Sequence, residues 1–219
     1  MNGAFVNGAK VKQSSLAFDL TEQAPAALPK VDYDYPQNPK DWSGLALIGE
    51  APGAEEARLG HPFVGRSGQL LDKMLQQAGI DRKRCFIGNV FRFQPPGNKV
   101  DHFFISKRAA KAADLPIAEE YGQFGSAWVR GDYAGEIDNL KVALNALKPR
   151  IIMALGRTPT WALTGLNGLL DKVGQSLPCR LVPEVRVIPT YHPSFIMRGN
   201  WALQPEWLKH FVNINQKIK

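Results

Sequence analysis

Short apolar runs alternate with amphipathic stretches from Leu45 to the end of the chain. Four runs have the length of buried strands: Leu45–Ile48, Cys85–Val90, Ile151–Leu155 and Val185–Pro189. Apolar residues recur at helical spacing in four other stretches: Ser67–Ala78, Ile137–Leu147, Thr158–Leu163 and Trp201–Ile214. Because strands that alternate with helices favour a parallel sheet covered on both faces, the pattern predicts an α/β fold.

Two segments do not follow this alternation. Residues 1–43 contain Pro25, Pro29, Pro36 and Pro39 and no long apolar period, so we expect an N-terminal leader that is mostly coil. Residues 99–133 are less regular, and we interpret them as an insertion that is partly helical around Ser106–Ala113. The main domain is then expected to span residues 44–219.

Charge and composition narrow the class of protein. Lys and Arg total 27 against 20 Asp and Glu, a formal charge of +7, which favours a polyanionic partner but also fits a basic enzyme without one. No run of about 18 apolar residues predicts a membrane span, and no signal peptide is recognisable. With only Cys85 and Cys179, we expect neither a disulfide scaffold nor a four-thiolate metal site, and a cytoplasmic protein fits best.

Polar loops follow each predicted strand. Their sequences are GEAPG, the stretch from Asn89 to Asn98, LGRTP and TYHPSFIMRGN. In parallel sheets, ligands bind outside the carboxyl ends of the strands, where such loops meet. The convergence of four polar loops at one edge therefore predicts a binding or catalytic site there.

Each loop residue has a structural and a functional interpretation. His192 follows a strand and precedes a proline, a position that suits a catalytic histidine as well as a structural one. Phe63, between Pro62 and Gly65, could belong to the core or could stack on a base. Asn89 ends a strand, where its amide offers both a donor and an acceptor. The glycine turn at Gly49 and Gly53 could cradle a phosphate or serve only as a turn.

Five spaced motifs together resemble the uracil-DNA glycosylase superfamily, closest to its iron–sulfur branch, families 4 and 5. They are GEAPGAEE, GHPFVGRSGQLLD, GNVFRFQPPGN, IIMALGRTPTWALTG and YHPSFIMR, in that order between Leu45 and Lys219. The resemblance implies a three-layer α/β/α domain with a central four-stranded parallel sheet. It also implies uracil-containing DNA as partner, and a target nucleotide that is flipped out of the base stack into a pocket at the sheet edge.

The resemblance also implies roles for individual residues. Phe63 would stack on uracil, Asn89 would read the uracil edge, and His192 would hydrogen-bond uracil O2 and stabilise the departing base. Glu50 would line the pocket as a second catalytic residue that positions water. Backbone amides around Ala51–Gly53 and Ser194 would hold phosphates or the base, and Arg198 would support a DNA-intercalating loop or contact phosphate. Ile196 and Met197 would either wedge into the gap left by the flipped base or pack on the last helix. Lys107 and Arg108 are assigned to DNA phosphates from the basic charge of the insertion and not from the resemblance.

The sequence departs from the iron–sulfur branch at the cluster ligands. That branch holds its cluster with four cysteines, two of which precede the first motif. This chain has no cysteine before Gly49. At the other two expected ligand positions it carries Phe93 and Glu136, or a neighbour of Glu136. We therefore expect no cluster and no metal. Apolar packing of Phe91 or Phe93 against the leader is expected to replace the cluster.

The first motif departs from the best-known uracil glycosylases as well. It has Ala51 where those carry a water-activating aspartate, and roughly Gly53 where a tyrosine excludes thymine. Catalysis is then expected to depend more on His192 and Glu50. His102, in the basic insertion, loosely resembles a histidine that becomes covalently linked to the abasic sugar in one relative. Two other interpretations of the insertion stay open: a basic loop that binds DNA phosphates, and a segment without a function.

The sequence thus predicts a monofunctional glycosylase that removes uracil from DNA, leaves an abasic site and releases free uracil. Two alternatives stay open: a protein that binds uracil or abasic DNA tightly and turns over poorly, and a glycosylase for another deaminated base. One pocket suffices for flipping and cleavage, so we expect a monomer.

Overall fold

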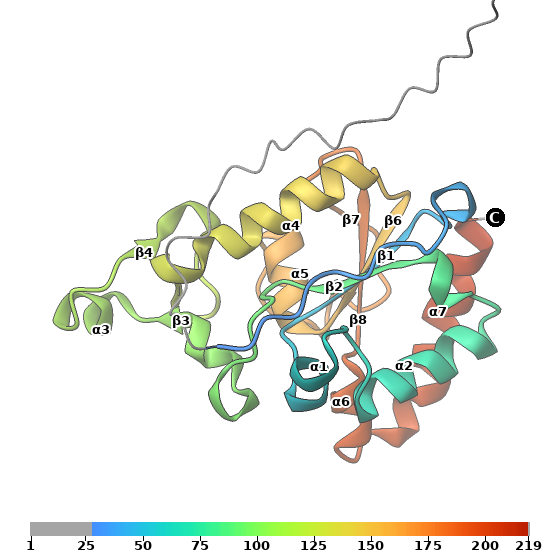
Figure 1. Cartoon of the computed structure of the whole chain (residues 1–219), viewed down its shortest axis with the longest axis horizontal. Helices are drawn as coiled ribbons and strands as arrows, with labels where there is room; N and C mark the ends of the chain where they lie inside the picture. The colour runs from blue at the N-terminus through green and yellow to red at the C-terminus, as the bar shows by residue number, and fades with distance from the viewer. Residues whose placement is uncertain (1–27, 219) are drawn as a thin grey trace, which may run out of the picture.

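A five-stranded sheet forms the centre of the molecule in the computed structural model, which describes residues 28–218 (Figure 1). Its strand order is β2-β1-β6-β8-β7. The parallel strands are β1 (Leu45–Gly49), β2 (Phe86–Asn89), β6 (Ile151–Leu155) and β8 (Arg186–Thr190). The fifth, β7 (Leu177–Pro178), pairs antiparallel with β8. The predicted α/β class is confirmed, but the predicted count of four strands is wrong, because a two-residue edge strand leaves no recognisable apolar run.

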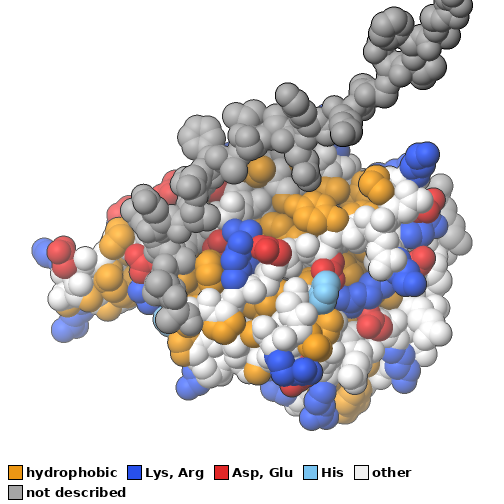
Figure 2. All heavy atoms as spheres, in the orientation of Figure 1, with side chains coloured by type: hydrophobic (Ala, Val, Ile, Leu, Met, Phe, Trp, Pro, Cys, Tyr) orange, Lys and Arg blue, Asp and Glu red, His pale blue; other side chains and the backbone are white. Residues whose placement is uncertain are grey.

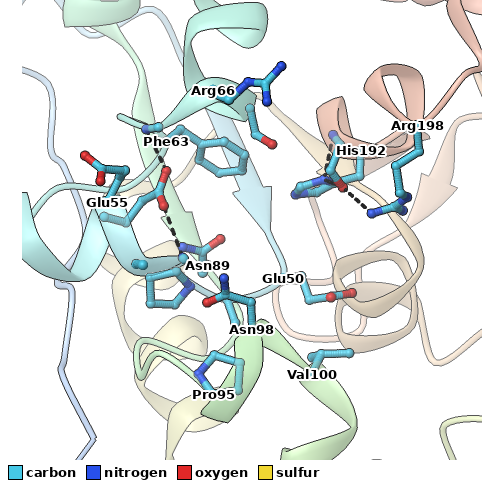
Figure 3. Close-up of a pocket in the computed structure, with 18 residues that line it drawn as sticks. Glu50, Glu55, Phe63, Arg66, Asn89, Pro95, Asn98, Val100, His192 and Arg198 are labelled. Atoms are coloured by element: carbon cyan, nitrogen blue, oxygen red, sulfur yellow. Dashed lines mark hydrogen bonds between the residues drawn. The ribbon is translucent and has the colours of Figure 1, made fainter.

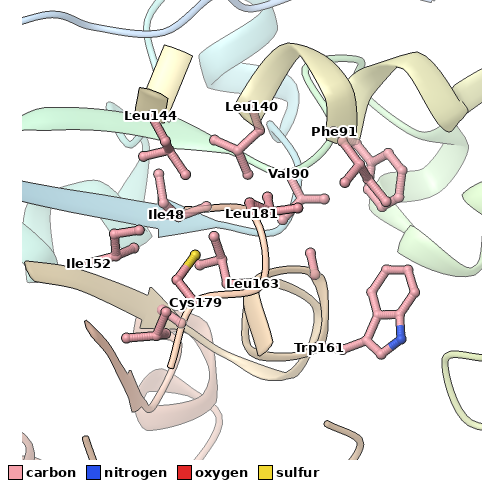
Figure 4. Close-up of a cluster of buried hydrophobic side chains, with 14 of the residues drawn as sticks. Ile48, Val90, Phe91, Leu140, Leu144, Ile152, Trp161, Leu163, Cys179 and Leu181 are labelled. Carbon is pink, nitrogen blue, oxygen red and sulfur yellow. The ribbon is translucent and has the colours of Figure 1, made fainter. Parts of the chain in front are cut away.

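Helices cover both faces of the sheet, which confirms the three-layer arrangement. One face carries α4 (Ala134–Leu147) and α5 (Arg157–Thr164), and the other carries α2 (Arg66–Gln77), α6 (Pro193–Met197) and α7 (Gln204–Ile218). Successive β1 side chains point to opposite faces: Ile48 packs in the cluster under α4 and α5 (Figure 4), and Leu47 packs under α2 and α7. The first helix, α1 (Ala54–Leu59), follows β1 directly.

Residues 99–133 form a small second sheet beside the main one, toward the left in Figure 1. Its order is β3-β5-β4, from β3 (Phe104–Ile105), β4 (Ile117–Ala118) and β5 (Trp128–Arg130). The expected helix is α3 (Lys107–Ala112), which the Ser106 hydroxyl caps by accepting from Ala109 N. Phe91 stacks on Phe103 with ring centroids 4.2 Å apart and so joins this segment to the main core.

Short 3₁₀ turns complete the described chain. They are Pro39–Asp41, Arg82–Arg84, Pro96–Asn98, Val100–Phe103, Glu119–Tyr121, Gly131–Tyr133 and Trp201–Leu203. No helix in residues 28–218 is long and apolar enough to cross a membrane.

The described part of the predicted leader runs along the outer edge of β2. Asp34 exchanges two backbone hydrogen bonds with Ile87, and Lys30 bridges to Phe93. An uncovered edge strand is a template for aggregation, and this coil covers part of the edge. The first 27 residues of the predicted leader lie outside the described residues.

A buried ion pair links the leader, the β2 loop and α4, in addition to apolar contacts of the leader such as Tyr33 and Tyr35 on Phe86. The Arg92 guanidinium donates to both carboxylate oxygens of Glu136 at 2.9 Å, and the Arg92 backbone N–H donates to Glu136 as well. Arg92 also contacts Asp32 of the leader at 3.2 Å. Phe93 and the leader residues Leu28 and Tyr33 pack against the apolar cluster that contains Phe91, as expected of an apolar staple. The rings of Phe91 and Phe93 themselves lie against Phe103 and Tyr133, and Phe93 meets the leader through its backbone bridge to Lys30.

Candidate functional site

The register of the sheet brings the four polar loops together at one edge. Gly49 pairs with Asn89, and Leu155 pairs with Thr190, so all four parallel strands end at the same level. A cavity of about 440 Å³ opens there (Figure 3). Seven of the residues that sequence analysis singled out line it: Glu50, Ala51, Gly53, Phe63, Asn89, His192 and Ser194, together with Arg198 at its rim.

Phe63 presents its ring to this cavity from the loop before α2. The ring lies 5.9 Å, centroid to centroid, from that of His192, with 38° between the planes. Gly49 makes room for it: a Cβ at Gly49 would lie 2.4 Å from Phe63 Cζ and 2.5 Å from Asn89 Oδ1. The absence of a side chain at the end of β1 therefore allows an aromatic face and an amide to share the cavity.

Asn89 reaches the cavity from the last residue of β2. Its side chain is 4% exposed, and its amide makes no hydrogen bond within residues 28–218. The amide is not among the fully buried polar atoms without a partner, because it lies on the wall of the open cavity. The Asn89 amide thus offers one donor and one acceptor to a planar polar ligand.

His192 is held in one tautomer by its own helix. As the N-cap of α6, its Nδ1 accepts from the backbone N–H of Ser194 at 3.1 Å. Burial and the nearby charge of Arg198 lower its pKa to about 4. The neutral ring at physiological pH therefore carries its proton on Nε2, which makes it a hydrogen-bond donor to a ligand.

Glu50 follows β1 and faces the cavity from the side opposite Phe63 in Figure 3. Its Oε2 accepts a 2.5 Å hydrogen bond from the hydroxyl of Thr158 on α5. Burial raises the pKa of Glu50, while the Thr158 hydrogen bond and the charge of Arg157 act in the opposite direction. One carboxylate oxygen is thus engaged with Thr158, and the other is available to a water or a cationic centre.

Two backbone amides that were expected to bind a ligand are already bonded within the protein. Gly53 N–H donates to Glu56 Oε2 at 3.1 Å, and Ser194 N–H donates to His192. Gly53 and Ser194 line the cavity, but their amides serve its internal framework. Local hydrogen bonds of this kind depend on side-chain direction, which the sequence does not reveal.

Cationic side chains flank the cavity on two sides. Arg198 donates to Ser194 Oγ at 3.2 Å beside His192, and Arg66, at the start of α2, lies on the side of Phe63, at the top of Figure 3. Further Lys and Arg side chains lie along the lower edge of the molecule around α1 and α2 (Figure 2). Lys107 and Arg108 are not brought to the cavity, because they belong to α3, and Lys107 pairs with Glu119 at 2.9 Å.

Burial and contacts bear on two alternatives that the sequence left open. Ile196 is fully buried in the core under α2 and α7, so it packs there and does not act as a wedge, whereas Met197 is half-buried. His102 does not line the cavity, because its Nε2 lies 2.8 Å from the Tyr133 hydroxyl.

Sequence analysis missed several residues of the site. Thr158 orients Glu50 from the LGRTP loop, and Arg66 follows the glycine that caps α2. Asn98 and Val100 form the wall on the side of the insertion. The LGRTP loop was recognised as part of the site edge, but nothing in it indicated that its threonine faces a carboxylate.

The side chains present do not fit an iron–sulfur cluster. The two cysteines lie on opposite faces of the sheet, Cys85 under α2 and α7 and Cys179 under α4 and α5. Burial raises the pKa of Cys85 to about 11, which disfavours the thiolate that binds iron. Near two ligand positions implied by the resemblance stand Phe93 and the ion-paired Glu136. No group of three or more potential metal ligands occurs in residues 28–218.

Comparison with known proteins identifies the family to which this chain is similar. The model of the uracil DNA glycosylase superfamily matches residues 36–219. Among curated proteins, the chain is 34% identical over 172 residues to the type-4 uracil-DNA glycosylase of Pyrobaculum aerophilum, covering 76% of this chain and 74% of that protein. It is 31% identical over 156 residues to the type-4 uracil-DNA glycosylase of Thermotoga maritima, covering 71% and 67%.

Proposed function

The chain belongs to the uracil-DNA glycosylase superfamily, and we propose that it is a monofunctional uracil-DNA glycosylase. It hydrolyses the N-glycosidic bond of uracil in DNA, leaves an abasic site and so starts base excision repair. The observation that carries this proposal is the meeting of Phe63, Asn89, His192 and Glu50 around one cavity at the carboxyl edge of the sheet.

The cavity suits one flipped nucleotide. A base inside a duplex is inaccessible, so the target must rotate out of the stack at a cost of a few kcal/mol. Stacking on the Phe63 ring compensates part of this cost, since base–aromatic stacking is worth about 1–3 kcal/mol. Because stacking is insensitive to sequence, selection of the base must come from polar groups.

Asn89 supplies that selection. Uracil presents an acceptor at O4 and a donor at N3–H, whereas cytosine presents an amino group and an unprotonated N3. The Asn89 amide, which lacks a partner within the described chain, pairs its N–H₂ with O4 and its oxygen with N3–H. With the amide in this orientation, both contacts are mismatched for cytosine.

His192 stabilises the departing base. Cleavage of the glycosidic bond places negative charge on uracil, and Nε2–H of the neutral His192 donates to O2 as that charge develops. A pre-positioned donor of this kind is worth roughly 3–4 kcal/mol in the transition state. A neutral donor needs no prior protonation, which suits a histidine whose pKa is about 4.

Glu50 acts on the sugar side. As the base leaves, positive charge grows on the deoxyribose, and the Glu50 carboxylate complements it and orients a water for attack at C1′. The Thr158 hydrogen bond keeps the carboxylate in place and favours its ionised form. Arg66 and Arg198 contact the phosphates on either side of the flipped nucleotide. Lys107 and Arg108 would contact DNA farther from the cavity.

The test is a labelled oligonucleotide with one uracil, incubated with the protein and then treated with alkali. We expect strand scission at uracil with the wild type and a rate reduced by roughly 10²–10³-fold in His192→Ala, the effect of losing one oxyanion-type donor. Glu184→Gln, an exposed carboxylate remote from the cavity, is the control. Absence of scission with the wild type contradicts the proposal.

A panel of oligonucleotides separates this activity from its alternatives. Hypoxanthine- and xanthine-containing strands test for another deaminated base, and a titration of protein against uracil DNA tests turnover. Cleavage that stops at one product per protein molecule would mark a tight binding protein, and gel filtration with and without DNA tests the expected monomer.

A further inference from the structure

Phe63 adopts a backbone conformation that its side chain disfavours. Its φ is +54°, in the left-handed region that non-glycine residues rarely enter. Such a residue persists only where its surroundings hold it, and such sites cluster at ligand-binding positions. The surroundings of the Pro62–Gly65 loop, which carries Phe63, therefore have to supply the restraint.

Arg82 holds the carbonyl groups of this loop. Its guanidinium donates to Phe63 O at 3.1 Å and to Pro62 O at 2.7 Å, and Asp72 on α2 fixes it with a 2.7 Å ion pair. The planar fork of arginine suits two neighbouring acceptors, and a lysine would offer no such geometry.

Glu56 holds the amide groups of the same loop. Its Oε1 accepts from Gly65 N–H at 2.8 Å and from Val64 N–H at 3.2 Å. Its Oε2 accepts from Gly53 N–H at 3.1 Å, in the loop after β1. One carboxylate on α1 thus binds three backbone donors from two loops, with charge-assisted hydrogen bonds.

The loop also packs closely against the start of α2. A Cβ at Gly68 would lie 1.8 Å from Phe63 O, so the loop lies directly on the first turn of α2. Phe63 is 5% exposed, and its ring contacts the cavity through the space that Gly49 leaves. Glu56 and Arg82 act on the backbone of the loop and not on the ring.

We propose that Glu56 and Arg82 are positioning residues, which clamp the Pro62–Gly65 loop from its amide and carbonyl sides and so hold the Phe63 ring as a pre-formed stacking surface for the flipped base. This inference rests on the proposed function. A surface ordered in advance spares the ordering cost at binding, so the clamp strengthens substrate binding without taking part in bond cleavage.

Glu56→Gln is the sharpest test, because it keeps the shape but turns one acceptor into a donor facing backbone N–H groups. In single-turnover excision of uracil, we expect the half-saturating protein concentration to rise roughly tenfold, the lower range of what a lost base–aromatic stack costs. The maximal rate should change by less than about twofold, since stacking acts on ground and transition states alike. Glu184→Gln, with the same change in charge, should match the wild type.

A double-mutant cycle with Phe63→Ala separates positioning from general stability. If Glu56 acts through the ring, Glu56→Gln should add no further loss of binding in the Phe63→Ala background. An equal loss in both backgrounds, or unaltered binding in Glu56→Gln alone, overturns the inference. Arg82→Lys gives the same cycle from the carbonyl side if Glu56→Gln does not fold.

Hydrogen exchange provides a readout that does not depend on activity. The Val64 and Gly65 amides should exchange faster in Glu56→Gln than in the wild type, while those of β6 stay protected. If the wild type excises no uracil but the Val64 and Gly65 amides lose protection in Glu56→Gln, the proposed function fails and the restraint of the loop by Glu56 stands. If the wild type excises uracil but the protection of these amides is the same in Glu56→Gln, the restraint by Glu56 fails and the proposed function stands.

Discussion

The hydroxyl of Thr158 donates a 2.5 Å hydrogen bond to Oε2 of Glu50. Thr158 is fully buried on α5, and Glu50 lies 108 positions earlier in the chain, at the end of β1. The charged groups around Glu50 are Arg157 and Arg198, which lower its pKa, and Asp101, which raises it. Among the described groups that lower the pKa of Glu50, the Thr158 hydroxyl is therefore the one without a charge.

Replacing Thr158 with valine removes this hydrogen bond without changing the side-chain shape. The pKa of Glu50, already raised by burial, should rise further, because a contribution that lowers it is lost. The acidic limb of the pH–rate profile should then move to higher pH, and Thr158→Ser should restore it. Thr164→Val, which removes a hydroxyl bonded to Thr160 O on the same helix, serves as control. An unmoved acidic limb in Thr158→Val would exclude the ionised Glu50 from the reaction.

His192→Asn tests the neutral state of the histidine through stability. The ordinary pKa of 6.5 falls to about 4 in the folded protein, so the unfolded chain binds the proton first. The stabilising contribution of neutral His192 is present above pH 6.5 and is lost as the pH falls toward 4. Urea unfolding across this range should show a shallower loss of stability for His192→Asn, which keeps an N-cap residue. His102 and His210, whose pKa values burial also lowers, retain their own contributions. Identical pH dependence in variant and wild type would contradict a lowered pKa.

Gly49→Ala should abolish uracil excision while the chain still folds. The added methyl group would meet the Phe63 ring and the Asn89 amide within 2.5 Å, so both must leave their positions in the cavity. Gly135→Ala on α4 is the matched control, because a Cβ there meets nothing within 4 Å. Because Gly135 is the second residue of α4, this control should change the stability by less than about 1 kcal/mol. Wild-type excision by Gly49→Ala would show that the ring and amide are not needed where they lie.

Asn89→Asp exchanges the donor of the amide for a second acceptor. The carboxylate would face uracil O4 without a proton between them, and an unsatisfied buried contact costs about 1–3 kcal/mol. Uracil excision should fall roughly ten- to hundredfold, while binding of DNA without uracil stays unchanged, as measured by fluorescence anisotropy. Asn213→Asp, at an exposed position of α7, controls for the change in charge. Unchanged excision would remove Asn89 from base recognition.

The Arg92–Glu136 pair should dominate the stability of the β2 loop. Its side chains are 15% and 7% exposed, so Glu136→Ala leaves a nearly buried guanidinium and should cost about 3–5 kcal/mol in urea unfolding. Arg92→Met combined with Glu136→Leu should recover most of that loss. Glu119→Ala breaks the exposed pair with Lys107 and should cost under about 1 kcal/mol. Equal costs for the two single variants would contradict a structural role for the buried pair.

Periodicity alone predicted the α/β class, the four parallel strands and the helices α2, α4, α5 and α7, but not the short helices α1 and α6. These features follow from which residues are apolar and at what spacing, which is a local property. The meeting of the polar loops also followed, because parallel strands must end at one edge. The edge strand β7 shows the limit: it spans only Leu177–Pro178, and a strand this short exists only through its pairing with β8.

Only the tertiary structure decided how the side chains of the site divide their roles. The motifs indicated Phe63, but not its left-handed backbone or the hold of Arg82 and Glu56 on its loop. The burial of Ile196 and the bond between Thr158 and Glu50 were likewise hidden. The direction of a side chain depends on partners far away in the sequence, and these become neighbours only when the sheet has formed.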